Sequence, residues 1–101
     1  MYLIQIGFLD VRLVDLPDPF LLPDMKIAAK RLHAAIESGE KIAIHGDYDV
    51  DGISGTVLLT GALGACGADV EYHIPLRLRD GYGLSAAAIK DAADRGIKVV
   101  V

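Results

Sequence analysis

The chain has 101 residues and a net charge of −4, and 52% of its residues are hydrophobic. This length allows one small domain with one core, and the composition is too apolar for a disordered chain. The charge argues against a general nucleic-acid coat protein, which would be basic. It leaves open a nuclease site that holds metal ions with acidic side chains.

No apolar run reaches the ~20 residues that cross a bilayer, and the N-terminus lacks the basic start of a signal peptide. Cys66 is the single cysteine. An internal disulfide is therefore impossible, and a reducing, cytoplasmic location is expected. Because Cys66 ends an apolar stretch, we expect it to be a small buried side chain.

Residues 1–24 are expected to form a connector segment, because three prolines fall within the ten residues DLPDPFLLPD and exclude a regular element there. Its apolar residues Phe20, Leu21 and Leu22 are expected to anchor it to an apolar surface. Residues 25–38 carry apolar side chains at helical spacing. They predict a helix that is capped at its start by Asp24 and ended by Gly39.

From residue 41 onward, short apolar runs alternate with helical patterns. The predicted elements are a strand at 41–45, a helix at 54–66, a strand at 70–74, a helix at 85–95 and a strand at 97–101. Helices between short apolar strands imply parallel pairing with right-handed crossovers. The sequence therefore predicts an α/β fold with a partial doubly wound parallel sheet of βαβαβ order. Ligands of such sheets lie beyond the carboxyl ends of the strands.

The first predicted strand leads directly into an acidic stretch, HGDYDVDG. It places Asp47, Asp49 and Asp51 at alternate positions, with His45 ahead of them. Carboxylates this close repel one another at neutral pH, and a bound cation would relieve the repulsion. Carboxylates with an imidazole suit manganese, and to a lesser degree magnesium. The pattern predicts a metal-dependent phosphoesterase in which His45, Asp49 and Asp51 hold one or two divalent ions.

Two features of the same stretch support a metal and phosphate site. Gly46 and Gly52 would let the backbone turn tightly around an ion. The helix expected from Ser54 would point its N-terminus at the site, where bound phosphate is favoured.

Two other readings of the acidic stretch compete with this one. An EF-hand loop would need a bidentate glutamate at its twelfth position, where this chain has Leu58. A phosphatase of the haloacid-dehalogenase type would place its D-x-D-G pair immediately after the strand. Here four residues, His45 to Tyr48, intervene.

Three stretches of the chain together resemble the DHH phosphoesterases, and within them the RecJ-type single-stranded-DNA exonucleases. HGDYDVDGISGTVLL resembles the first motif of that family nearly letter for letter. FLDVRLVDLPDPFLLPDM resembles the segment that precedes its catalytic domain, and IPLRLRDGYGLS resembles its I-P-x-R-x-x-(E/D)-G-Y-G stretch.

The resemblance implies a divalent-metal-dependent exonuclease that degrades single-stranded DNA from 5′ to 3′ in DNA repair and recombination, with Mn²⁺ or Mg²⁺ as cofactor. Asp49 and Asp51 match metal-binding, catalytic carboxylates of the family. His45 matches a histidine of the wider superfamily's motif, and Asp47 matches a position that either ligates or supports the ligands. Other DHH phosphoesterases, which hydrolyse oligonucleotides or cyclic dinucleotides, and a non-catalytic DHH-like scaffold remain alternatives.

Two further residues are expected to meet the substrate. Arg77 matches the arginine of the I-P-x-R stretch and would face a phosphate, since a guanidinium suits that geometry. Tyr82 would either stack on a base or pack the turn. We expect His73 to be a packing or surface residue.

The resemblance also implies that residues 25–101 are the N-terminal part of a DHH domain. The strand at 97–101 resembles one that leads into the family's second motif. We therefore expect the chain to be an N-terminal fragment that is inactive alone. In the family the third strand lies beside the first and pairs with a fourth, so here its open edge is expected to cause self-association.

Overall fold

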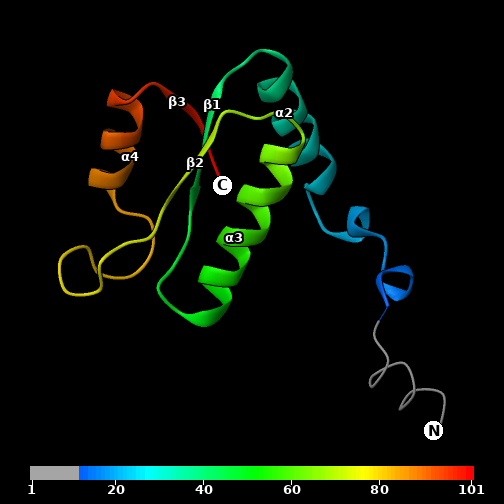
Figure 1. The fold of residues 1–101 in the computed structure, drawn as a ribbon, viewed down its shortest axis with the longest axis horizontal. Helices are drawn as coiled ribbons and strands as arrows, with labels where there is room; N and C mark the ends of the chain where they lie inside the picture. Colours follow the sequence, from blue (N-terminus) through cyan, green and yellow to red (C-terminus); the bar gives the residue numbers. More distant parts are fainter. Residues whose placement is uncertain (1–11) are drawn as a thin grey trace, which may run out of the picture.

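The computed structural model describes residues 12–101 and confirms the predicted α/β fold (Figure 1). Two single 3-10 turns, η1 and η2, precede three helices and three strands. In chain order the elements are η1 (Leu13–Asp15), η2 (Pro19–Leu21), α2 (Met25–Glu37), β1 (Lys41–His45), α3 (Val50–Ala65), β2 (Val70–His73), α4 (Ala86–Asp94) and β3 (Ile97–Val100). The strands form one parallel sheet of order β2-β1-β3. The third strand therefore lies beside the first, as the family resemblance implied.

The central strand β1 has helices on both sides of it, with α4 on one side and α2 and α3 on the other (Figure 1). Successive side chains of a strand point to opposite faces. Ile42 and Ile44 pack with Ala35 of α2 in one buried cluster, against which Leu59 and Leu63 of α3 also pack. A second cluster joins the remaining face of β1 to α4 and β3 through Ala43, Ala92 and Ile97. The acidic loop, residues 46–52, leaves the sheet at the carboxyl end of β1.

Helix α3 begins at Val50, four residues earlier than the predicted Ser54. The reason is local, because Asp49 is its N-cap and accepts a hydrogen bond from the backbone N–H of Gly52 at 2.9 Å. Asp51 therefore lies in the first helical turn, so the acidic loop, residues 46–52, overlaps the start of α3.

The predicted capping of α2 by the side chain of Asp24 is wrong. Asp24 makes no side-chain capping bond and adopts a left-handed φ of 60°. Its backbone carbonyl instead accepts hydrogen bonds from Ile27 and Ala28, each at 2.9 Å. At the other end the prediction is confirmed, since Gly39 has a φ of 64° that a glycine adopts without strain.

The connector departs from its predicted packing. Asp18 caps η2 by accepting from the N–H of Phe20 at 2.9 Å, so the proline-rich stretch does hold short regular turns. Phe20, Leu21 and Leu22 are all more than half exposed, and the predicted apolar anchoring is therefore wrong within the described residues. Cys66 is likewise exposed rather than buried. Of the segment that resembles the one preceding the catalytic domain, residues 8–25, the first four residues lie outside the described residues.

Among residues 12–101, the structure contains no helix long and apolar enough to cross a membrane.

Candidate metal and phosphate site

The acidic loop is fixed at its start by the two outer strands. His45 donates its backbone N–H to the carbonyl of Val101 at 2.7 Å, and Gly46 donates to the carbonyl of His73 at 2.9 Å. The loop therefore begins where all three strands come together. This is the carboxyl edge of the sheet, where α/β proteins bind ligands.

The sequence predicts that Gly46 and Gly52 allow tight turns of the backbone around an ion. In the structure, both positions require glycine because neighbouring atoms are packed closely against them. A Cβ atom on Gly46 would collide with the hydroxyl of Thr56, and one on Gly52 would approach Cβ of Asp47 to 2.6 Å. Neither glycine is among the residues with positive φ. The acidic loop is thus pressed against the first turns of α3.

The carboxylates of the loop have structural roles without any ion. Asp47 accepts from the N–H of Tyr48 at 2.8 Å through Oδ1, and Asp49 caps α3 through Oδ1. Asp51 lies in the first turn of α3, where the helix dipole favours negative charge. These contacts offset part of the repulsion among the three carboxylates.

The predicted metal ligands do not converge on one point. In the described part of the chain, no three His, Cys, Asp or Glu side chains are grouped closely enough to hold a metal ion. The donor types fit a hard divalent cation, but their number and arrangement do not complete a coordination shell.

His45, a predicted ligand, points instead toward the loop that follows β2. Its Nε2 lies 3.3 Å from the carbonyl oxygen of Gly83. Its ring stacks on that of His73 with centroids 5.3 Å apart and planes 28° from parallel. The two histidines are register partners on β1 and β2, so the packing role expected for His73 is confirmed.

Residues 75–84 form the arginine loop, and hydrogen bonds to the side chain of Asp80 hold its conformation. The Asp80 carboxylate accepts from the backbone N–H of Leu76 at 2.9 Å and from Nε of Arg79 at 2.7 Å. The hydrogen bond from Arg79, followed by that from Leu76, lowers the pKa of Asp80 to about 2. Sequence reasoning gave Asp80 no role, because a contact with a backbone N–H four residues away is not visible in a residue pattern.

Tyr82 and Arg77, the two predicted substrate contacts, meet at the ring of Tyr48. The guanidinium carbon of Arg77 lies 5.4 Å from the centroid of that ring. Tyr82 meets it edge to face, with centroids 6.1 Å apart and planes at 78°. Tyr82 is 76% exposed, so its ring remains available to a ligand.

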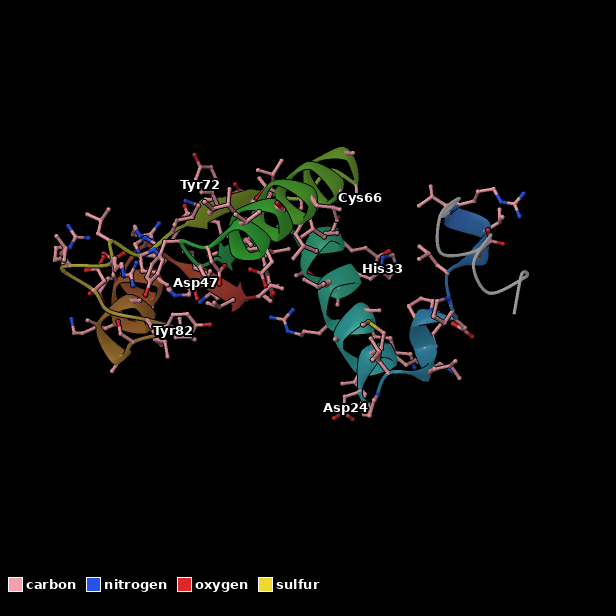
Figure 2. All side chains as sticks on the ribbon, turned by 90° about the horizontal axis from the view of Figure 1, so that it is seen from below. Asp24, His33, Asp47, Cys66, Tyr72 and Tyr82 are labelled. Atoms are coloured by element: carbon pink, nitrogen blue, oxygen red, sulfur yellow. The ribbon has the colours of Figure 1, made fainter. Side chains whose placement is uncertain are left out.

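The acidic loop and the arginine loop share one electrostatic environment. The negative charge of Asp47 raises the pKa of Tyr82, and the charges of Asp49 and Asp51 raise it further. Figure 2 shows Asp47 and Tyr82 at the same end of the molecule, away from His33 and Cys66. An open hollow of about 510 Å³ is lined in part by the acidic loop, the first turns of α3 and residues 82–84 of the arginine loop. Its polar lining includes His45, Asp47, Asp51, Thr56 and Tyr82.

Sequence reasoning missed two residues of this region. Thr56 is 4% exposed and donates its hydroxyl to the carbonyl of Gly52 at 2.7 Å, which ties the first turns of α3 together. Tyr48 stands between two acids of the quoted stretch, and an aromatic residue inside a charged loop was the available signal.

No family model matches the chain. Curated proteins do: the single-stranded-DNA-specific exonuclease RecJ of Bacillus subtilis is 38% identical over 94 residues, which are 93% of this chain and 12% of the relative. The RecJ of Thermus thermophilus is 48% identical over 73 residues, 69% of this chain and 11% of the relative. The chain thus spans about an eighth of the length of these relatives.

Two solved structures share the fold. A crystal structure of exonuclease RecJ bound to manganese matches with a TM-score of 0.66 and 33% identity, over 84% of this chain and 27% of that one. RecJ of Thermus thermophilus in complex with Mn²⁺ matches with a TM-score of 0.59 and 35% identity, over 91% of this chain and 16% of that one.

The fold and the site together define an α/β protein of the doubly wound type, with an acidic loop at the carboxyl edge of its parallel sheet. Over the segment that it covers, the chain belongs to the RecJ-type proteins. The EF-hand alternative is excluded by the fold, since Leu58 lies inside α3 and a strand precedes the loop.

Proposed function

We propose that this chain supplies part of the metal site and the phosphate-facing loop of a manganese-dependent exonuclease that hydrolyses single-stranded DNA from its 5′ end. The observation that carries the proposal is the meeting of the acidic loop and the arginine loop around one hollow. The proteins it resembles are single-stranded-DNA-specific exonucleases, and two solved relatives are bound to manganese.

Asp49 and Asp51 are the proposed catalytic metal ligands, with Asp47 and His45 as further ligands. Asp49 keeps its cap through one oxygen, which leaves the other for a cation. His45 would have to release the carbonyl of Gly83 before its Nε2 could bind an ion. Because manganese and magnesium favour about six ligands, these side chains alone should bind weakly, with water at the remaining positions.

A bound divalent ion would supply an activated water and charge stabilisation for phosphodiester hydrolysis. The chain's own residues would bind and orient the strand. Arg77 would contact phosphate oxygens through its guanidinium, and the exposed ring of Tyr82 would stack on a base. The N-terminus of α3 would favour the same phosphate.

The remaining parts of the proposal follow from the same relatives. Residues 25–101 would form part of a DHH domain, with residues 1–24 as a connector ahead of it. The activity would serve DNA repair and recombination in the cytoplasm.

Manganese binding by this chain tests the metal part of the proposal. The electron paramagnetic resonance signal of free Mn²⁺ should fall as the chain is added, with an affinity well weaker than the low micromolar range. Asp49→Asn and Asp51→Asn should each reduce this binding while the fold is kept, since asparagine can replace Asp49 as the cap and Asp51 is exposed. Asp69→Asn, at the opposite edge of the sheet, is the matched control. Tight binding, or equal binding by all three variants, would contradict the assigned ligand set.

We also propose that the chain self-associates through β3. In the described residues β3 pairs only with β1, and Val100 and Val101 remain 39% and 42% exposed. An apolar strand edge invites pairing with another chain, which across a two-fold axis is antiparallel. Light scattering over a dilution series should show association that Val100→Lys abolishes. A monomer at high concentration, unchanged by Val100→Lys, would contradict self-association through this edge.

A further inference from the structure

Tyr48 is the aromatic side chain that both predicted substrate residues of the arginine loop contact. Tyr48 belongs to the acidic loop. Its backbone N–H donates a hydrogen bond to Oδ1 of Asp47 at 2.8 Å. Its ring face carries the guanidinium of Arg77 and its ring contacts that of Tyr82, so both predicted substrate residues rest on it.

The geometry points to Tyr48 as the positioning residue that fixes Arg77 and Tyr82 relative to the carboxylates of the acidic loop. This inference rests on the proposed function, because it concerns how that site is assembled. Tyr48 itself would touch neither the metal ion nor the phosphate. It would act through Arg77, whose long side chain samples many rotamers when nothing holds it.

The other contacts described for the arginine loop do not hold Arg77 against the acidic loop. Asp80 ties the loop to itself through Leu76 and Arg79 and, in the described residues, makes no hydrogen bond or ion pair with the acidic loop. The contact of His45 with Gly83 reaches the far end of the loop, close to Tyr82 but six residues from Arg77. Among residues 12–101, it is the contact with the Tyr48 ring that joins Arg77 to the loop that carries Asp49.

A double-mutant cycle on nucleotide binding tests the inference. The probe is 5′-phosphorylated hexathymidylate in Mg²⁺, titrated into the isotope-labelled chain and followed by NMR. Tyr48→Leu should weaken binding about two- to fivefold, the range set by an exposed cation–π contact. It should also remove the upfield ring-current shift of the Arg77 side chain. Tyr48→Phe, which keeps the ring, should restore both, and Tyr72→Leu is the control for loss of an exposed tyrosine.

The combination with Arg77→Gln separates positioning from general damage. If Tyr48 acts through Arg77 as well as through Tyr82, Tyr48→Leu should weaken binding less in the Arg77→Gln background than in the wild-type chain. The amide shifts of β1 and α3 must stay unchanged in each variant, which shows that the fold is kept.

The outcomes distinguish a failure of the positioning role of Tyr48 from a failure of the proposed function. A wild-type chain that does not respond to the oligonucleotide contradicts the proposed function and this inference with it. A wild-type chain that responds, together with Tyr48→Leu binding equally well or with additive losses in the double variant, contradicts the positioning role alone.

Discussion

The acidic loop and the arginine loop meet at the same hollow, but they are held in different ways. The acidic loop is fixed by backbone hydrogen bonds to two strands and by glycines packed against Thr56 and Asp47. The arginine loop is fixed by the side chain of Asp80 and by aromatic contacts with its neighbour. The ligand-bearing loop is therefore part of the fold, whereas the loop proposed to contact the substrate is attached through side chains that can be changed singly.

The largest effect is expected where the acidic loop is packed most closely. Gly46→Ala should destabilise the chain by about 1–3 kcal/mol, the usual cost of overpacking, because the new methyl group collides with Thr56. Urea unfolding measures the change. Gly61→Ala in α3 is the matched control, since nothing lies within 4 Å of its added Cβ and alanine favours a helix. Equal effects of the two substitutions would show that the loop is not packed as described.

A smaller effect separates capping from metal binding within the same loop. Asp49→Ala should lower the free energy of unfolding by about 1 kcal/mol through loss of the N-cap, whereas Asp49→Asn should leave it nearly unchanged. Both should lose manganese binding. Thermal unfolding of the two variants without metal checks the prediction, which fails if asparagine destabilises as much as alanine.

The elements of the fold were predictable because each depends on local pattern. The strand at 41–45 has the predicted bounds, and Ser85 caps α4 through a bond to Ala88 at 3.1 Å. The start of α3 was missed because Asp49 has the right chemistry both for a cap and for a metal ligand. A residue pattern does not separate these roles.

The candidate site was predictable in its residues but not in its contacts. Asp47 and Tyr82 were singled out separately, and nothing in the sequence indicates that one raises the pKa of the other. The approach of His45 to Gly83 spans 38 positions of sequence. It depends on how the sheet brings the ends of β1 and β2 together, which no local pattern reports.

The smallest effect is expected in the arginine loop and depends on pH. The pKa of Asp80 in the folded chain is about 2 and lies below its ordinary value of 3.8. Its contribution to loop order is therefore present above about pH 4 and is lost as the pH falls through about 2. The amide of Leu76, followed by NMR between pH 5 and about pH 1, should lose its hydrogen-bonded shift with that midpoint, and Asp80→Asn should remove the transition. A midpoint near 4 would mean that Arg79 and Leu76 do not hold the carboxylate.

The claim that the two loops form one metal and phosphate site is tested most directly by paramagnetic broadening. Mn²⁺ should be added in small amounts to the isotope-labelled chain while every amide signal is observed. The account predicts that signals of residues 47–52 broaden first and those of Tyr82 and Gly83 next, whereas Gly39 and Asp69 at the opposite edge of the sheet stay sharp. Broadening centred away from the acidic loop, or confined to that loop without reaching Tyr82, would contradict it.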